Sequence, residues 1–442
     1  MRLHISFILI LVLLLTSCGG DGGDGLPTDP PDEKPVPEIT AVEPDSGKFG
    51  TEVTISGNNF SSTTSENNVT FNDIEATLVS ATETELVAEV PEGAETGPVE
   101  VTVESKTAEG PEFTYIPTVT VSTYAGTGES GSQNGDRFQA EFNFPQDLTI
   151  KDDGTLYIAD EDNHLIREIS PEGQVTTLAG DEGTPGFEDG TGTEARFDGP
   201  CGLALDEQGS LVVADRFNNS IRKVTAAGAV TTFAGDTAAG FSDGTGTEAK
   251  FDKPCGVAMD ENQNLFVAEI FNHNIRKITP AAVVETYAGT GEAGYKDGPP
   301  IIAQFRRPEG PAITTNGHLL IADGNNDVVR VIPPGGEVST LAGDGTEGDR
   351  DGTVEEARFN SPSDIAVGQD GPIYISENSN NVIRRIKDGQ VTTLAGTGEF
   401  GFVDGPGEDA QFHNPRGVVI DDEGNLFVVD SGNHGIRKIT IR

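Results

Sequence analysis

The chain has 442 residues, with 28 lysines and arginines against 73 aspartates and glutamates, and its net charge is −45. So acidic a surface repels a phosphate backbone, which excludes a nucleic-acid binder. Three cysteines are too few for a disulfide-built scaffold, and β-branched residues that alternate with polar ones between glycine-rich turns predict an all-β fold.

Residues 1–17 predict a secretory signal peptide, because a short basic start precedes an apolar run from Ile5 to Leu15 that is too short to span a bilayer. The run ends in Leu15-Thr16-Ser17-Cys18, which resembles the bacterial lipobox. This resemblance implies that Cys18 is acylated and becomes the new N-terminus. The next residue is Gly19 and not aspartate, which favours the outer membrane as destination. The alternative is an ordinary signal peptide with a chance cysteine.

Residues 18–36 contain glycine, proline and acidic residues with almost nothing to bury, so we expect a flexible tether between the lipid and the folded part. Like charge would hold this acidic segment away from an anionic headgroup layer.

Residues 37–115 alternate apolar and polar positions in short stretches separated by turns, as in a β-sandwich. The strings Pro44-Asp45-Ser46-Gly47 and Gly57-Asn58-Asn59-Phe60 resemble the IPT/TIG family of immunoglobulin-like domains. The resemblance implies a rigid spacer, or alternatively a module that binds a partner.

Residues 119–442 are dominated by an internal repeat of 53 to 55 residues. Each copy predicts four short strands, which cannot bury both faces of one sheet unless the copies pack around an axis. The prediction is a six-bladed β-propeller, in which residues 119–124 supply the missing strand of the last blade and close the ring. The six copies begin at Val121, Val175, Val230, Val284, Val338 and Val391.

The repeat consensus resembles the NHL family, as in Phe197-x-x-Pro200-x-Gly202 followed by Leu211-Val212-Val213-Ala214-Asp215. The resemblance covers all six copies and implies the fold, but it does not imply one function.

Residues that all six copies share are assigned to the scaffold, because every blade needs them. An acidic residue ends the second strand, an asparagine follows in the turn, and an arginine lies in the third strand. The acidic residues are Asp160, Asp215, Glu269, Asp323, Glu377 and Asp430; the arginines are Arg167, Arg222, Arg276, Arg330, Arg384 and Arg437.

Histidines would be the starting point for a metal-dependent enzyme, since zinc-dependent lyases exist on this type of propeller. Yet His164, His273 and His434 share one turn position that the other copies fill with Asn219, Asp327 and Asn381. This interchange indicates a polar turn residue. We therefore expect no metal, no other cofactor and no catalytic residue, and a metal-dependent hydrolase or lyase is the third-ranked function.

We expect the functional residues at positions where the copies differ. These positions lie on the face that holds the long loops between the fourth and first strands and the turns between the second and third strands. The residue after the repeated proline enters the innermost strand and differs in character around the ring, where Glu309 and Arg416 would offer opposite charges to a polar ligand. The alternative is that these residues only plug the pore together with water. The set is Gln146, Cys201, Cys255, Glu309, Ser363 and Arg416. Cys201 and Cys255 occupy neighbouring blades and could form a disulfide or remain buried thiols.

The turn tips of the second and third copies, Arg216-Phe217 and Ile270-Phe271, are unusually apolar and are the predicted surface site. Four loop aromatics, Phe187, Phe241, Tyr295 and Phe402, are explained equally well by local packing.

These features predict an acylated lipoprotein of the outer membrane, facing the cell surface or alternatively the periplasm, that acts as a non-catalytic binding module. It resembles accessory proteins that capture glycans or other nutrients beside an outer-membrane transporter. The absence of Trp and the presence of six Tyr count against a sugar ligand, so an interaction scaffold for proteins of the cell envelope is the alternative.

Overall fold

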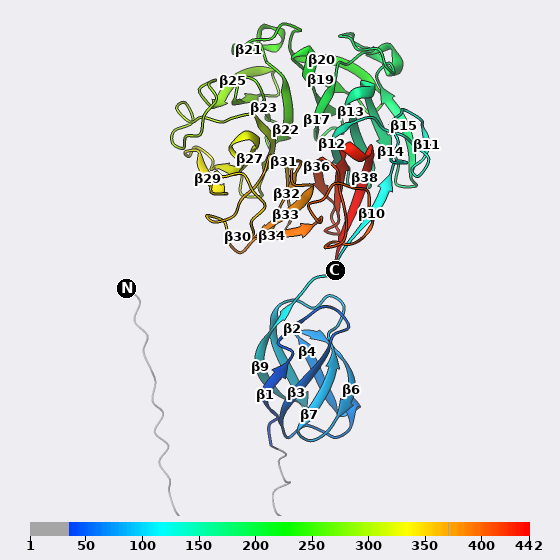
Figure 1. Cartoon of the computed structure of the whole chain (residues 1–442), viewed down its shortest axis with the longest axis vertical. Coiled ribbons are helices and arrows are strands. Elements are labelled where there is room, and N and C mark those ends of the chain that lie inside the picture. Colours follow the sequence, from blue (N-terminus) through cyan, green and yellow to red (C-terminus); the bar gives the residue numbers. More distant parts are fainter. Residues whose placement is uncertain (1–34, 370) are drawn as a thin grey trace, which may run out of the picture. The chain divides into compact units, whose positions relative to one another are not determined.

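The computed structural model describes residues 35–369 and 371–442, in two compact units that divide between Tyr115 and Ile116 (Figure 1). The predicted signal peptide, Cys18 and nearly all of the predicted tether lie outside the described residues. Within the described ranges no helix is both long and apolar enough to cross a membrane.

The first unit is a sandwich of two sheets whose apolar side chains alternate with exposed polar ones along each strand. Phe71 and Phe113 meet edge to face in its core, with ring centroids 5.0 Å apart. One sheet has the order β1 (Glu38–Glu43), β3 (Glu52–Asn58), β7 (Glu85–Glu89) and β6 (Thr77–Ala81). The other has the order β2 (Ser46–Gly47), β9 (Lys106–Tyr115), β8 (Gly97–Val103), β4 (Asn67–Phe71) and β5 (Ile74–Glu75), and a 3-10 turn, η1 (Thr64–Glu66), precedes β4.

The second unit is a six-bladed propeller built from six antiparallel sheets (Figure 1). The innermost strands of neighbouring blades contact one another all around the ring. From the axis outward, blade 1 contains β12 (Pro145–Ile150), β13 (Leu156–Asp160), β14 (Leu165–Ile169), β15 (Gln174–Ala179) and β11 (Gly135–Asp136). Blade 2 contains β17 (Pro200–Leu205), β18 (Leu211–Asp215), β19 (Ser220–Val224), β20 (Ala229–Gly235) and β16 (Gly190–Thr191). Blade 3 contains β22 (Pro254–Met259), β23 (Leu265–Glu269), β24 (Asn274–Ile278), β25 (Val283–Ala288) and β21 (Gly244–Thr245).

Blade 4 has four strands, β26 (Pro308–Ile313), β27 (Leu319–Asp323), β28 (Val328–Ile332) and β29 (Ser339–Ala342). Blade 5 contains β31 (Pro362–Val367), β32 (Ile373–Glu377), β33 (Val382–Lys387), β34 (Gln390–Ala395) and β30 (Gly352–Thr353). Blade 6 contains β36 (Pro415–Ile420), β37 (Leu426–Asp430), β38 (Gly435–Ile441), β10 (Val119–Ala125) and β35 (Gly405–Pro406). The remaining 3-10 turns are η2 (Glu161–Asn163), η3 (Gly192–Glu194), η4 (Arg216–Asn218), η5 (Gly246–Glu248), η6 (Gly324–Asn326) and η7 (Ser431–Asn433).

The ring is closed by its first strand, because β10 lies between β38 and β35. Val121 is opposite Ile439, and the backbone N–H of Thr118 donates to the carbonyl of Arg442 at 2.7 Å. The two ends of the propeller chain are thereby joined in one sheet.

The second strand of a blade is buried on both faces, because the neighbouring blades pack against it. Phe197, for example, shares one apolar cluster with Tyr157 and Ala159 of blade 1 and with Leu203 and Leu211 of blade 2. The second strand therefore carries apolar residues at successive positions, because each of its two faces packs against a neighbouring blade.

The shared arginines, acids and asparagines form one buried network in every blade. In blade 2, Arg222 donates to Asp215 at 2.8 Å and to Asp189 at 2.7 Å, and Asn218 donates to Asp215 at 2.9 Å. Burial raises the pKa of Asp215 to about 6, against the opposing effect of Arg222. The guanidinium lies 4.7 Å from the ring centroid of Phe187, one of the loop aromatics.

The other three loop aromatics lie in the same way over a shared arginine. The pairs are Arg276 with Phe241, Arg330 with Tyr295 and Arg437 with Phe402, at 5.4, 5.2 and 4.9 Å. Local packing on a cation therefore accounts for these aromatics.

Candidate functional site

The residue after the repeated proline and the turn between strands two and three lie at the same end of each blade. In blade 2, for example, Pro200 at the start of β17 pairs with Asp215 at the end of β18. We call this end of the propeller the mouth face. Both sets of residues singled out in the sequence therefore come together around one end of the axis.

The six residues that follow the repeated proline line one cavity on the axis. Its volume is about 30 Å³, which is room for about two water molecules. The cavity is too small for an organic ligand, so a ligand of the mouth face would lie across the opening and not inside the channel.

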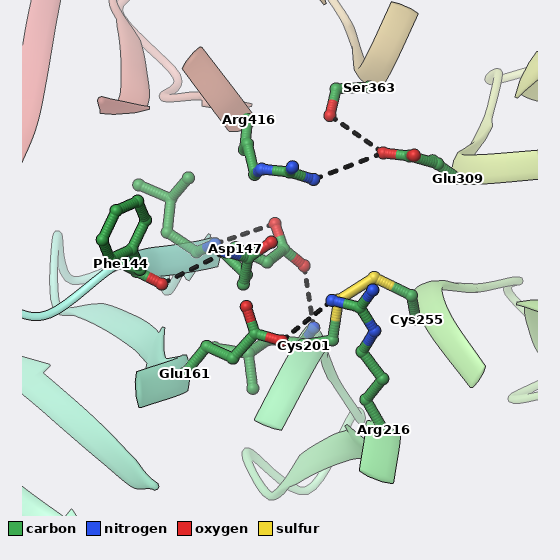
Figure 2. The surroundings of a disulfide bond; sticks show 12 residues. Phe144, Asp147, Glu161, Cys201, Arg216, Cys255, Glu309, Ser363 and Arg416 are labelled. Atoms are coloured by element: carbon green, nitrogen blue, oxygen red, sulfur yellow. Dashed lines mark hydrogen bonds and ion pairs between the residues drawn. A yellow bond between two sulfur atoms is a disulfide. The ribbon is translucent and has the colours of Figure 1, made fainter. Parts of the chain in front are cut away.

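Glu309 and Arg416 approach each other, with Arg416 Nη1 3.5 Å from Glu309 Oε2 (Figure 2). Ser363 Oγ donates to the same carboxylate oxygen at 3.2 Å. Gln146 Nε2 donates to the carbonyl of Phe144, also at 3.2 Å. The opposite charges predicted to meet a ligand thus neutralise each other across the axis.

Cys201 and Cys255 form a disulfide between the innermost strands β17 and β22, with their Cα atoms 5.0 Å apart (Figure 2). Ile270 packs against this disulfide and is only 2% exposed. Ile270 therefore does not belong to the exposed tip predicted from the sequence. The first residue of a blade's turn is directed inward, and in blade 3 the disulfide offers it an apolar partner.

Arg216 occupies the same turn position in blade 2 and is also partly buried. Its Nη1 lies 2.8 Å from Glu161 Oε1, which comes from the equivalent position of blade 1 (Figure 2). Burial raises the pKa of Glu161, and Arg216 and Arg416 oppose that rise. First turn positions therefore contact neighbouring blades, while second positions face outward.

Phe217 and Phe271 hold those second positions and are 40% and 53% exposed. Lys253 Nζ lies 4.2 Å from the ring centroid of Phe217, and the guanidinium of Arg216 lies 5.1 Å from it. Two exposed phenyl rings thus stand on the turns of adjacent blades at the mouth face. Phe144, directly before the repeated proline of blade 1, is a third ring of this face and is 39% exposed.

Two buried aspartates near the axis were missed in the sequence. Asp147 Oδ2 accepts the N–H of Leu203 in the next blade, and Asp364 Oδ2 accepts that of Val418, each at 2.8 Å. Burial raises the pKa of Asp147 to about 7. Burial and the nearby Asp147 raise the pKa of Asp364 well above its usual range.

The sequence does distinguish these aspartates, because they are the second residues after the repeated proline in blades 1 and 5. The other four blades have glycine there, at Gly202, Gly256, Gly310 and Gly417. A Cβ on Gly202 would come within 2.1 Å of the carbonyl oxygen of Cys255. Backbones therefore approach closely in most of the ring, and the two aspartates bridge blades where a side chain has space.

The three turn histidines accept hydrogen bonds from the backbone of the next blade. Nδ1 of His164, His273 and His434 accepts the N–H of Gly199, Arg307 and Phe144, at 3.1, 3.2 and 3.2 Å. Oδ1 of Asn219, Asp327 and Asn381 does the same for Lys253, Ser361 and Asn414. Among the residues that the structure describes, no three His, Cys, Asp or Glu side chains are arranged to hold a metal ion.

Comparison with known proteins supports both parts of the fold. The IPT/TIG domain family matches residues 37–115, and the NHL repeat family matches residues 142–169 and 412–439. The chain therefore carries an IPT/TIG domain followed by a β-propeller with NHL repeats.

Curated relatives include two proteins at or above 30% identity. Protein SUPPRESSOR OF QUENCHING 1, chloroplastic, from Arabidopsis thaliana is 30% identical over 319 residues, which are 67% of this chain and 30% of that protein. NHL repeat-containing protein 2 from Bos taurus is 32% identical over 268 residues, which are 52% of this chain and 36% of that protein. The chain thus spans about a third of the length of these relatives.

Solved structures with the same architecture come from Bacteroides. A protein of unknown function from Bacteroides thetaiotaomicron has a TM-score of 0.60 at 22% identity, covering 93% of this chain and 99% of the other. An auxiliary nutrient binding protein from Bacteroides ovatus has a TM-score of 0.58 at 17% identity, covering 92% of this chain and 99% of the other. At these identities the likeness shows the fold.

Proposed function

We propose that this protein is a non-catalytic binding protein of the bacterial cell envelope, which captures a glycan or another nutrient on the mouth face of its propeller. The observation that carries the proposal is the pair of exposed rings, Phe217 and Phe271, on adjacent blades. Exposed aromatic rings beside polar groups are typical of binding surfaces, because they release much apolar area on contact and lose little side-chain entropy.

The residues around these rings support binding and not catalysis. Glu309 is held by Arg416 and Ser363, and Glu161 is held by Arg216. The turn histidines use Nδ1 to accept backbone hydrogen bonds. These side chains hold the blades together, which leaves the rim as the surface available to a ligand.

The envelope location rests on Cys18 and on the disulfide. Disulfides persist in oxidising compartments, so Cys201 and Cys255 agree with a secreted chain. Acylation of Cys18 would tether the folded units to the outer membrane, with the body facing the cell surface. Metabolic labelling with palmitate tests this, and Cys18→Ala should abolish the label and release the protein from membranes.

Binding to a panel of polysaccharides, measured by calorimetry, tests the ligand side of the proposal. The Phe217→Ala/Phe271→Ala variant should bind at least about tenfold more weakly, because two stacked apolar contacts are lost. Phe138→Ala is the matched control, since Phe138 is also exposed but follows the outer strand β11. Undiminished binding by the double variant would remove this site.

A protein partner is the second candidate, favoured by the absence of Trp and the presence of only six Tyr. Isolation of the protein in mild detergent should then recover an outer-membrane transporter or another envelope protein. Loss of that partner in the Phe217→Ala/Phe271→Ala variant, without any polysaccharide binding, would favour this candidate over glycan capture.

A further inference from the structure

Three basic side chains of the mouth face lack an acidic partner. Lys253 lies directly before the repeated proline of blade 3, and Arg306 and Arg307 precede that of blade 4. Within the described residues, none of the three has an ion pair with a carboxylate. Most other solvent-facing cations of the propeller do have one, such as Lys223 with Asp206 at 2.6 Å and Arg358 with Asp344 at 2.8 Å.

This grouping is unexpected in a chain with 73 acidic and 28 basic residues. The residue before the repeated proline is uncharged in the other four blades, where it is Phe144, Gly199, Ser361 and Asn414. At the position directly before the repeated proline, a cation therefore occurs only in blades 3 and 4.

Backbone hydrogen bonds place these cations between the turn tips. The N–H of Lys253 donates to Asn219 in the turn of blade 2, and the N–H of Arg307 donates to His273 in the turn of blade 3. Those turns carry Phe217 and Phe271. An exposed ring, a cation, a second exposed ring and a second cation thus follow one another from blade 2 to blade 4.

Arg306 and Arg307 act on the neighbouring His273. Burial lowers the pKa of His273, and Arg306 and Arg307 lower it further, while Asp252 raises it. Arg306 also acts on Asp327, whose pKa burial raises and Arg306 lowers to a smaller extent, so Asp252 and Asp327 are carboxylates of this neighbourhood. Lys253 lies over the ring of Phe217, and within the described residues none of the three cations is held in an ion pair, so an anion at this part of the rim could contact them.

We infer that the ligand of the mouth face is an acidic glycan, in which carboxylates of uronic acid residues contact Lys253, Arg306 and Arg307. The apolar faces of the sugar rings would lie on Phe217 and Phe271. A uronic acid combines a flat apolar face and a carboxylate within one ring, which matches the alternation of rings and cations along the rim. Arginine in addition offers paired donors to a carboxylate. This inference rests on the proposed function and names its ligand class.

The test measures binding of the full chain to polygalacturonate, to the neutral polymer dextran and to polyglutamate. We expect polygalacturonate to bind, with an affinity that falls as salt rises, and the two other polymers to bind at least about tenfold more weakly. Arg306→Gln/Arg307→Gln should weaken polygalacturonate binding at least about tenfold.

Lys296→Gln/Lys387→Gln is the control, because it removes the same charge from the outer loop of blade 4 and from the end of β33 that lies away from the turn tips. It should bind as the unaltered chain does. Equal losses in both variants would mean a general charge effect and would overturn the inference.

The other outcomes separate the inference from the proposed function. Tight binding of dextran that depends on Phe217 and Phe271 but not on Arg306 and Arg307 would overturn the acidic ligand and leave glycan capture standing. Polyglutamate binding as tight as that of polygalacturonate would overturn the glycan assignment in favour of an acidic protein. Failure of every polysaccharide on the panel would overturn the proposed function itself.

Discussion

One residue position in each blade links that blade to the next through a single hydrogen bond. It is filled by three histidines, two asparagines and an aspartate, all with positive φ between 50° and 58°. These residues share a short side chain whose acceptor atom reaches the next blade. They also adopt the left-handed backbone more readily than most other residues do. The chemistry required here is acceptance of an N–H, which explains why histidine and asparagine interchange.

His434→Asn and His434→Leu should separate this role from simple packing. The asparagine retains an acceptor for the N–H of Phe144 and suits the φ of 52°, so it should cost less than about 0.5 kcal/mol. The leucine leaves that N–H unpaired and should cost about 1–2 kcal/mol. Urea denaturation measures both values. Equal stability of the two variants would show that the hydrogen bond contributes little.

The same histidines give the fold a dependence on pH. Burial lowers the pKa of His273 and His434 below the ordinary value of 6.5, so the unfolded chain takes up protons that the folded chain still excludes. Their contribution to the free energy of unfolding is therefore complete above pH 6.5 and falls as the pH drops from there to the folded pKa.

The buried Glu269 and Glu377, whose pKa values burial raises to about 7, titrate in an overlapping range, so the test compares two proteins. The stability of the unaltered chain relative to His273→Asn/His434→Asn should decline as the pH falls below 6.5. Denaturation curves across this range measure it. A constant difference would mean that the histidines do not titrate differently on folding.

At the scale of elements, the innermost strands approach so closely that their register depends on very small residues. A Cβ on Gly256 would come within 2.2 Å of the carbonyl oxygen of Glu309, just as one on Gly202 would meet Cys255. The disulfide, the ion pair of Glu309 with Arg416 and the bridging Asp147 and Asp364 all join neighbouring or facing strands at this narrow point. The varied residues after the proline therefore hold the hub together and enclose only a cavity of about 30 Å³, which is too small for an organic ligand.

The Cys201→Ala/Cys255→Ala variant should be less stable than the unaltered chain by about 4 kcal/mol at most, since the bond closes a loop with a sequence separation of 54. Reductant should lower the thermal midpoint of the unaltered chain and leave the variant unchanged. Differential scanning fluorimetry with and without dithiothreitol measures this. A reductant effect on the variant would point to a cause other than this bond.

At the scale of the whole molecule, the repeat period predicted the six blades because each copy repeats the same buried strands and the same arginine network. The exposure of Phe217 and Phe271 followed from comparing copies at one turn position. The burial of Ile270 could not be predicted in this way. It depends on the disulfide between Cys201 and Cys255, and the sequence alone did not decide whether these two cysteines are bonded. Nor could the role given to Lys253, Arg306 and Arg307 be predicted, because the sequence does not show which cations form ion pairs in three dimensions.

Ring closure is the step on which the whole propeller depends, and it can be tested by shortening the chain. A chain that begins at Gly126 lacks β10, so β35 loses its partner and the edge of β38 is left unpaired. An unpaired strand edge recruits other chains, and we expect this protein to aggregate on size-exclusion chromatography and to unfold at lower temperature. A chain that begins at Ile116 retains β10 and should not aggregate, since the two units divide there. Addition of a peptide of residues 116–125 should restore the shorter chain. If the shorter chain were instead monomeric and equally stable without the peptide, the closing strand would not be what holds the ring together.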